Sequence, residues 1–308
     1  MKTSRIPILV TGSQRSGTTW VGRTISQHPL VRYEHEPFNT FYPNPMFGLR
    51  INDYYAHYES SGQQAEIKQA FDKLLYAGKL SEAISLCRAT GISRYTPAQF
   101  FKQLCLTPRQ RILIKDPIAL LSASWLYKTY GCQVICMIRN PLAFVASQKK
   151  ADWDIDFEHL RRQKALMNSQ LTPFKSDLEY VCAHPESVDL IDRSALLWNV
   201  LHAVILEYRR TYPEWLFIRH EDAARDPVPA FQRMFSYLGL EPTPEIQAYI
   251  ATYTSARKNV HAQSTKYQPR DSKASIHAWQ DILSDEEALR VDAATRKIAA
   301  NFYDHSTS

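Results

Sequence analysis

Residues 11–20 read Thr-Gly-Ser-Gln-Arg-Ser-Gly-Thr-Thr-Trp, and they directly follow the apolar run Ile-Pro-Ile-Leu-Val at positions 6–10. This order predicts a strand that feeds a small-residue loop and then a helix, which continues through Val21 and Ile25 and ends at Pro29. A loop of this kind turns several backbone N–H groups and the positive end of a helix dipole towards one point. The stretch therefore predicts a strand–loop–helix unit that binds a phosphate group.

The loop has the spacing of a P-loop, Gly-x-x-x-x-Gly, but it lacks the lysine of that motif. Thr18 and Thr19 stand where a P-loop has Lys followed by Ser or Thr. Such a loop serves a nucleoside triphosphate with Mg²⁺ poorly. The cation Arg15 lies inside the loop instead.

A second candidate phosphate element lies near the middle of the chain. The apolar run at 133–138 suits a buried parallel strand, and Pro141 fits the first turn of a following helix. Arg139 then lies at the carboxyl end of that strand, where open α/β sheets bind ligands. Its guanidinium can bind a phosphate bidentately, and the hydroxyl of Ser147 can add one donor. Together the two elements fit a nucleotide with phosphates at both ends of its ribose.

Both elements resemble those of one family, the sulfotransferases that use 3′-phosphoadenosine 5′-phosphosulfate (PAPS). Residues 14–20 look like the family's 5′-phosphosulfate loop, and Arg-x-Pro at 139–141 with the later serine resembles its 3′-phosphate element. The resemblance implies PAPS as the sulfuryl donor and no metal ion. The cofactor-binding residues that it implies are Arg15, Ser16, Gly17, Thr18, Thr19, Trp20, Arg139, Ser147, Arg270 and Lys273.

Three of these residues have an alternative role. Trp20 resembles the position at which some family members stack the adenine, but a tryptophan there can also be buried in the core. Arg270 and Lys273 resemble the C-terminal loop that closes over the 3′-phosphate, although polar loops also carry solvated cations.

The catalytic base is expected at Glu36, with Arg15 and Lys115 as the other catalytic residues. Many small-molecule sulfotransferases have Lys-Thr-His at a position where this chain has Lys115-Asp116-Pro117, so that histidine is absent. Glu36 resembles the glutamate base of the carbohydrate-type members, which implies an acceptor hydroxyl or amine on a glycan or glycoconjugate. Desolvation near a sheet edge is expected to raise its pKa towards that role.

Alternatives to this assignment remain open on the sequence alone. His35 and Asp116 compete with Glu36 as the base, and Lys115 either contacts the transferring sulfuryl group or forms a salt bridge at a strand end. The cation Arg15 would stabilise the leaving group. Two other functions compete with the whole assignment: a P-loop phosphotransferase, and a non-catalytic protein that binds adenosine bisphosphate.

The overall pattern predicts an α/β fold, with a central mostly parallel sheet flanked by helices and a P-loop-like first unit. We expect one sulfotransferase domain over residues 1–308, with a helical insertion at about 60–110 and a possible lid at about 151–189. A long helix is expected at 189–212, and a capping box opens a last helix at Ser284. The expected strands are 6–11, 31–35, 112–115, 133–138 and 215–219.

Composition excludes several other classes of protein. The formal net charge of +6 suits an anionic ligand, but the basic residues are scattered among acidic ones, so nucleic acid is not an expected partner. The five cysteines and the histidines lack metal-site spacing, and we expect the cysteines to be reduced. No apolar stretch is long enough for a membrane span, and the N-terminus lacks signal-peptide features, which predicts a cytoplasmic location. The oligomeric state is not determined by the sequence.

Overall fold

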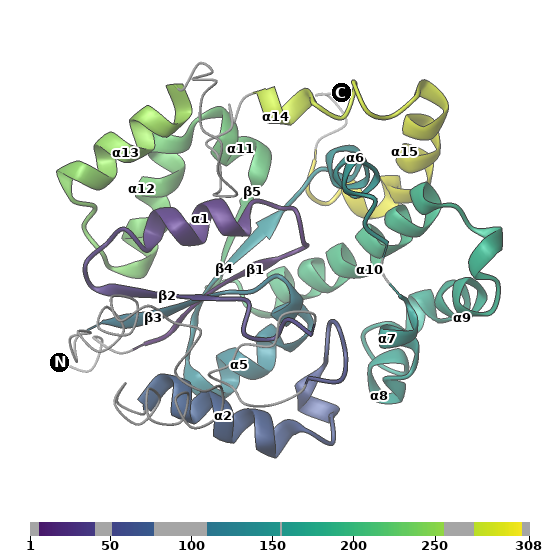
Figure 1. Cartoon of the computed structure of the whole chain (residues 1–308), viewed down its shortest axis with the longest axis horizontal. Helices are drawn as coiled ribbons and strands as arrows, with labels where there is room; N and C mark the ends of the chain where they lie inside the picture. Colours follow the sequence, from purple (N-terminus) through teal and green to yellow (C-terminus); the bar gives the residue numbers. More distant parts are fainter. Residues whose placement is uncertain (1–5, 41–50, 77–109, 155, 256–273, 304–308) are drawn as a thin grey trace, which may run out of the picture.

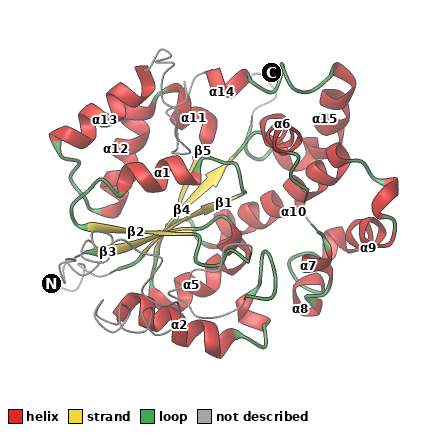
Figure 2. Cartoon of the chain, in the orientation of Figure 1, coloured by secondary structure: helices red, strands yellow, loops and turns green. Residues whose placement is uncertain are grey.

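The computed structural model describes residues 6–40, 51–76, 110–154, 156–255 and 274–303 (Figure 1). Its centre is a five-stranded sheet of order β2-β3-β1-β4-β5, in which every neighbouring pair is parallel (Figure 2). The strands are β1 Ile8–Gly12, β2 Val31–His35, β3 Arg111–Lys115, β4 Gln133–Ile138 and β5 Leu216–Arg219. The five expected strands and the parallel α/β class are therefore confirmed, with strand ends shifted by at most two residues.

Helices cover both faces of the sheet, as an all-parallel sheet requires. On one face, Ile8 and Val10 of β1 pack with residues of α1, α12 and α13. On the other face, Leu9 packs with residues of α2, α5 and α10. The helices are α1 Thr18–Ile25, α2 Gln64–Tyr76, α5 Ala123–Tyr130, α6 Pro141–Ala151, α7 Glu158–Arg161, α8 Lys164–Met167, α9 Lys175–Ala183, α10 Leu190–Thr211, α11 His220–Arg225, α12 Pro227–Leu238, α13 Pro244–Ser255, α14 Ala274–His277 and α15 Asp285–Ala299.

Several local predictions are confirmed by these helices. α10 begins after Asp189, whose side chain accepts from Asp192 N–H, and α15 begins with the expected capping box at Ser284. The insertion is helical over α2, whereas 77–109 lies outside the described residues. The candidate lid at 151–189 consists of short helices, α7 to α9, and its role as a lid stays a prediction, as does the single domain.

The strand order places the topological switch point of the sheet, where doubly wound folds have a ligand crevice, between β1 and β4. α1 leaves β1 towards β3 and β2, whereas α6 leaves β4 and packs against α10 and α15 on the other side. Two neighbouring parallel strands whose helices leave in opposite directions open a gap at their carboxyl ends, and ligands of doubly wound proteins bind there. This position places the loop at 13–17 opposite Arg139.

A buried arginine links the strands at their amino ends, on the side of the sheet opposite to the predicted site. Arg111, only 6% exposed at the start of β3, donates to Ile6 O at 2.8 Å and to Leu238 O at 2.6 Å. It also donates to Gln133 Oε1, and the amide of Gln133 donates to Tyr237 O at 2.7 Å. These bonds join β1, β3 and β4 to the end of α12, away from the crevice.

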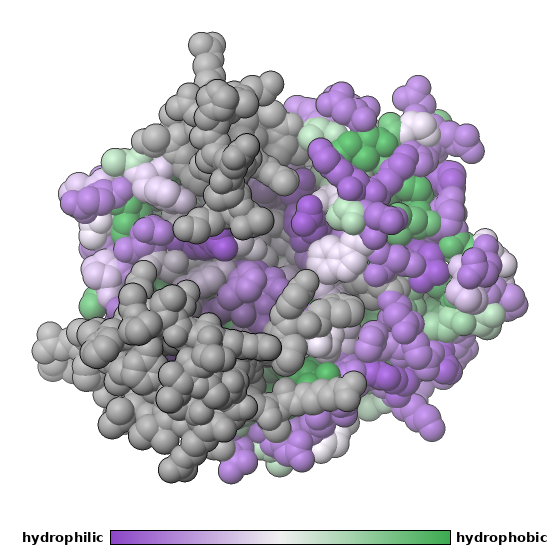
Figure 3. All heavy atoms as spheres, viewed as in Figure 1, coloured by the Kyte–Doolittle hydropathy of each residue, from purple (hydrophilic) through white to green (hydrophobic). Residues whose placement is uncertain are grey.

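On the face drawn in Figure 3, the described residues are mostly hydrophilic, with smaller hydrophobic areas between them. Across the described ranges, no helix is both long and apolar enough to span a bilayer.

Candidate active site

Two glycines shape the loop after β1. Gly12 has a φ of 137°, and a Cβ on it would lie 2.2 Å from Met137 O of β4. Gly17 has a φ of 89°, and a Cβ on it would lie 2.5 Å from His220 Nδ1. Only glycine fits either position without a rearrangement, because the main chain passes too close to its neighbours and φ is positive. The loop is thereby pressed against the ends of β4 and β5.

The start of α1 presents N–H groups for an anion. Ser16 N–H closes a turn on Ser13 O at 3.3 Å, and the first helical bond runs from Val21 N–H to Gly17 O at 3.1 Å. No side chain caps this helix, so the N–H groups of its first turn point out of the helix end. The hydroxyl of Ser16 donates to Ser13 O at 2.5 Å, so it is occupied within the loop. The amides of Thr18 and the residues beside it are therefore the donors that suit a phosphate.

The two predicted phosphate elements meet at the crevice. Arg15 Nε donates to Ser147 Oγ at 2.7 Å, and Arg139 Nη1 donates to Arg15 O at 2.8 Å. Arg15 is exposed and has a φ of 64°, a left-handed conformation that turns its side chain out of the loop. The structure thus brings Arg15, Arg139 and Ser147 together although they are up to 132 positions apart.

Two residues of α10 that the sequence did not single out hold the backbone of Arg139. Trp198 Nε1 donates to Arg139 O at 2.8 Å, and Arg139 N–H donates to His202 Nε2 at 3.4 Å. His202 Nδ1–H in turn donates to Trp198 O at 2.9 Å, which fixes the neutral tautomer with Nε2 as an acceptor. Burial lowers the pKa of His202 to about 3. The stacked rings, with centroids 3.9 Å apart, therefore form a rigid support for the arginine.

A carboxylate supports the next residue in the same turn. Asn140 N–H donates to Glu221 Oε1 at 3.0 Å, and Tyr303 OH donates to Glu221 Oε2 at 3.0 Å. Glu221 Oε1 also lies 3.8 Å from Arg139 Nε. Asn140 caps α6 through its side chain, which accepts from Leu142 N–H at 2.9 Å. The sequence indicated Arg139 because a charged residue lies on a strand-to-helix turn. The residues that hold this turn lie on α10, α11 and the C-terminal segment, far away in the sequence, so no local pattern pointed to them.

Glu36 and Lys115 form an ion pair at the carboxyl ends of β2 and β3. The two strands are neighbours, with His35 opposite Lys115, so Glu36 directly follows the paired residue. Lys115 Nζ contacts Glu36 Oε1; the lysine side chain is fully buried and 21% of the glutamate side chain is exposed. α1 passes close to Lys115 at Gly22, where a Cβ would lie 3.0 Å from the lysine stem. The salt bridge foreseen as an alternative for Lys115 is therefore present.

The pKa expected for Glu36 is contradicted by its surroundings. Burial raises the pKa of Glu36, but the charge and hydrogen bond of Lys115, together with a hydrogen bond from Asn39, outweigh burial and hold it below its ordinary value. Burial also lowers the pKa of Lys115, with Glu36 opposing that change. Glu36 is thus ionised at neutral pH and can accept a proton, but it is stabilised as an anion rather than poised near neutrality.

Asp116 and His35, the two residues that compete with Glu36 as the base, differ from it in their contacts. Asp116 is fully buried, and its carboxylate accepts from the N–H groups of Phe38 at 2.8 Å and Ile118 at 2.9 Å. Burial, reinforced by the charge of Glu36, raises the pKa of Asp116 to about 7. The side chain of His35 reaches the surface and pairs with Tyr33 OH at 3.1 Å, and partial desolvation and the charge of Lys115 lower its pKa. Asp116 is therefore occupied by the backbone, whereas His35 faces solvent next to the site.

Trp20 lies in the core rather than at the open edge. Its side chain is 6% exposed, and its ring packs edge-on against Phe231 at 5.1 Å and His220 at 6.2 Å. The core alternative for Trp20 is the one that the structure bears out, and little surface is left for an adenine. Arg270 and Lys273 lie outside the described residues, so their assignment stays a prediction. Within the described ranges, no group of three or more His, Cys, Asp or Glu residues is placed to hold a metal ion.

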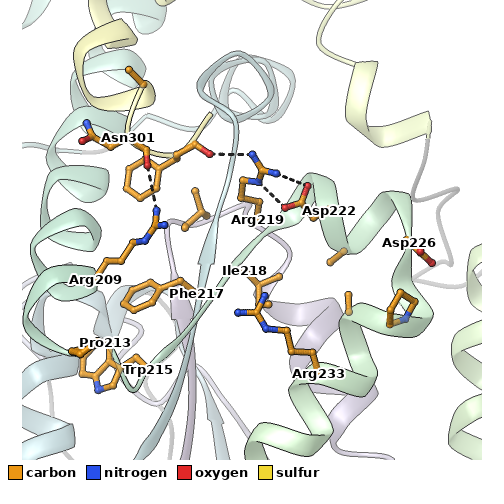
Figure 4. A pocket seen from close by; sticks show the side chains of 16 residues that line it. Arg209, Pro213, Trp215, Phe217, Ile218, Arg219, Asp222, Asp226, Arg233 and Asn301 are labelled. Carbon is orange, nitrogen blue, oxygen red and sulfur yellow. Dashed lines mark hydrogen bonds and ion pairs between the residues drawn. The ribbon is translucent and has the colours of Figure 1, made fainter. Parts of the chain in front are cut away.

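A separate groove of about 840 Å³ runs along the outer side of β5 (Figure 4). Arg219 lies there, paired with Asp222, and donates to Phe302 O at 3.1 Å, while Arg209 donates to Asn301 O at 3.2 Å. These bonds attach the C-terminal segment to β5 and to α10. The groove contains no predicted site residue, so its size does not make it the reaction site.

The chain is similar to several known proteins. The sulfotransferase family profile matches residues 7–245. Carbohydrate sulfotransferase 5 of Mus musculus is 22% identical over 326 residues, which cover 93% of this chain and 78% of the relative. Carbohydrate sulfotransferase 7 of Rattus norvegicus is 27% identical over 94 residues, covering 29% of this chain and 19% of the relative.

Two solved structures also resemble the chain. The sulfotransferase domain of the Synechococcus PCC 7002 olefin synthase has a TM-score of 0.49 at 17% identity and covers 97% of this chain and 96% of its own. Mouse sulfotransferase SULT7A1, solved with PAP, has a TM-score of 0.43 at 13% identity and covers 97% of this chain and 88% of its own. Both scores are below 0.5, so the family assignment depends on the profile match.

The fold is that of a P-loop-like α/β protein, in which the strand-to-helix turns after β1 and β4 lie side by side at one edge of the sheet. The profile match covers more than half of the chain, and the protein belongs to the sulfotransferase family.

Proposed function

We propose that the protein transfers the sulfuryl group of PAPS to a hydroxyl or amine of a carbohydrate-containing acceptor. The observation that carries this proposal is the order of charged groups along one edge of the sheet: Glu36 after β2, Lys115 at the end of β3, Arg15 after β1 and Arg139 after β4. Adjacent strands are about 4.8 Å apart, so about 14 Å separates the first of these positions from the last. That span suits a nucleotide with an acceptor in line beside it.

Each of these residues has a role in the transfer. Arg139, Ser147 and the open N–H groups of α1 bind the two phosphate ends of the donor. Glu36 accepts the proton of the acceptor O–H or N–H as that atom bonds to sulfur. The bond between sulfur and the 5′-phosphate oxygen breaks, its electron pair stays on that oxygen, and Arg15 stabilises the new charge. Lys115, paired with Glu36, keeps the base ionised until it takes up the proton of the acceptor.

The carbohydrate acceptor is proposed because the curated relatives are carbohydrate sulfotransferases, because Glu36 after β2 resembles the glutamate base of the carbohydrate-type members, and because the histidine base expected at the end of β3 is replaced by Pro117. A sulfuryl group carries less negative charge than a phosphoryl group, so arginine, lysine and N–H donors suffice in this proposal without a metal ion. The cytoplasmic location stays a prediction from the sequence alone.

Radiolabelled PAPS, incubated with a panel of hexose and N-acetylhexosamine methyl glycosides, tests the proposal. We expect transfer by the wild-type protein, loss of transfer with retained binding of 3′,5′-adenosine bisphosphate in Glu36→Gln, and loss of bisphosphate binding in Arg139→Ala. Wild-type transfer rates in Glu36→Gln would remove the base assignment. Thermal stabilisation by ATP with Mg²⁺, but not by the metal-free bisphosphate, would indicate a phosphotransferase instead.

A further inference from the structure

The turn that carries Glu36 is tight and strained. Glu36 N–H donates to Lys115 O at 2.8 Å, and Asn39 N–H donates back to Glu36 O at 3.1 Å. Glu36 has a φ of 45°, in the left-handed region, where a residue with a side chain is destabilised by about 1 kcal/mol or more. Such a conformation persists only where the surrounding contacts hold it. The contacts of this turn therefore identify the groups that fix the carboxylate.

Both oxygens of the Glu36 carboxylate have a donor. Lys115 contacts Oε1, and Asn39 Nδ2 donates to Oε2 at 2.8 Å. The amide nitrogen of Asn39 must face the carboxylate, because the opposite orientation would place two oxygens in contact. Asn39 is itself only 8% exposed, so its side chain is held in place. Only the remaining, exposed part of the carboxylate is open to an acceptor.

The middle of the turn is anchored as well. Phe38 N–H donates to Asp116 Oδ2 at 2.8 Å, and the Phe38 ring is 1% exposed. The ring packs on Tyr58 and Phe71, with centroid distances of 5.3 and 5.9 Å. Because the neighbouring residue is fixed by both its backbone and its side chain, Asn39 cannot move away from Glu36 without breaking this packing.

We infer that Asn39 is a positioning residue for Glu36, which orients the carboxylate and stabilises its ionised form for proton transfer. The inference rests on the proposed function, since it gives Glu36 the role of base. A donor on Oε2 stabilises the anion and leaves the exposed face of the carboxylate as the proton acceptor. The turn at 36–39 then sets both the direction and the basicity of the base.

A role in the turn alone makes a different prediction. Asn39→Asp has nearly the shape of the wild type but replaces the amide donor with an anionic oxygen beside Glu36. Asn39→Ala removes the donor without adding a charge. If Asn39 only closed the turn through its backbone N–H, Asn39→Ala, which keeps that N–H, would behave as the wild type.

The experiment measures sulfuryl transfer from PAPS against pH with the methyl glycoside that the wild type modifies fastest. We expect kcat at neutral pH to fall about tenfold in Asn39→Ala and further in Asn39→Asp, with the KM for PAPS unchanged. The acidic limb of the kcat profile should move to higher pH in Asn39→Ala and further in Asn39→Asp, because each change destabilises the ionised carboxylate. Gln247→Ala, which removes an exposed side-chain amide on α13 away from Glu36, is the matched control and should keep the wild-type profile.

A second measurement needs no turnover. The titration of Glu36 is followed by NMR in protein labelled at the side-chain carboxyl carbon of glutamate, and its signal is assigned with Glu36→Gln. We expect the pKa of Glu36 in this titration to be lowest in the wild type, higher in Asn39→Ala and highest in Asn39→Asp. If the wild type is active, and the acidic limbs and the Glu36 titrations of the wild type, Asn39→Ala and Asn39→Asp coincide, the inference about Asn39 is overturned while the proposed function stands. The absence of transfer by the wild type with every acceptor tested overturns the proposed function, and with it the role of Asn39 in positioning a base.

Discussion

Acidification should destabilise the protein through His202. The buried imidazole takes up a proton only near pH 3, whereas in the unfolded chain it does so near its ordinary pKa of 6.5. The unfolded state therefore binds more protons between these values, and the free energy of unfolding falls as the pH is lowered from 6.5 towards 3. At pH 5 the loss relative to pH 8 is about 2 kcal/mol, since each pKa unit corresponds to about 1.4 kcal/mol.

Urea unfolding of the wild type and of His202→Gln, at pH 8 and pH 5, measures this contribution. Glutamine does not titrate, and its carbonyl oxygen can still accept from Arg139 N–H. We expect the variant to be less stable at pH 8 but to lose about 2 kcal/mol less than the wild type on going to pH 5. His184→Gln, at an exposed position, is the matched control. Parallel losses in the wild type and His202→Gln would refute the reasoning, because the remaining buried histidines would then account for the whole effect.

Three further substitutions test the loop after β1, the support of Arg139 by α10, and the buried arginine at the amino ends of the strands. Gly12→Ala should destabilise the fold by more than about 2 kcal/mol in urea unfolding, because the new Cβ would lie 2.2 Å from Met137 O. Trp198→Phe removes the bond to Arg139 O and should weaken calorimetric binding of 3′,5′-adenosine bisphosphate about fivefold, or about 1 kcal/mol; unchanged affinity would contradict this support. Arg111→Met should lower the free energy of unfolding by about 3 kcal/mol, from three lost bonds, yet leave bisphosphate affinity unchanged.

The base shows where local sequence reasoning was wrong. The prediction that desolvation raises the pKa of Glu36 considered only the position of a carboxylate at a sheet edge. The pairing of β2 with β3 brings Lys115 to Glu36, and the turn brings Asn39. These two donors lower the pKa of Glu36 instead of letting burial raise it. Neither partner was recognised from the sequence, because Lys115 is 79 positions away and Asn39 became a donor only through the left-handed turn.

The sequence by itself determined the strands, the glycine-containing loop after β1 and the start of several helices, because these depend on short-range properties: apolar runs, glycines at fixed spacing, a proline at a helix start and a capping box. Tertiary structure decided which of the candidate residues meet. The strand order places the ends of β1 and β4 side by side, which joins Arg15 to Ser147 and gives Arg139 its support from Trp198 and His202. It also buried Trp20 against α12, since the fate of an aromatic side chain depends on the helix that packs over it.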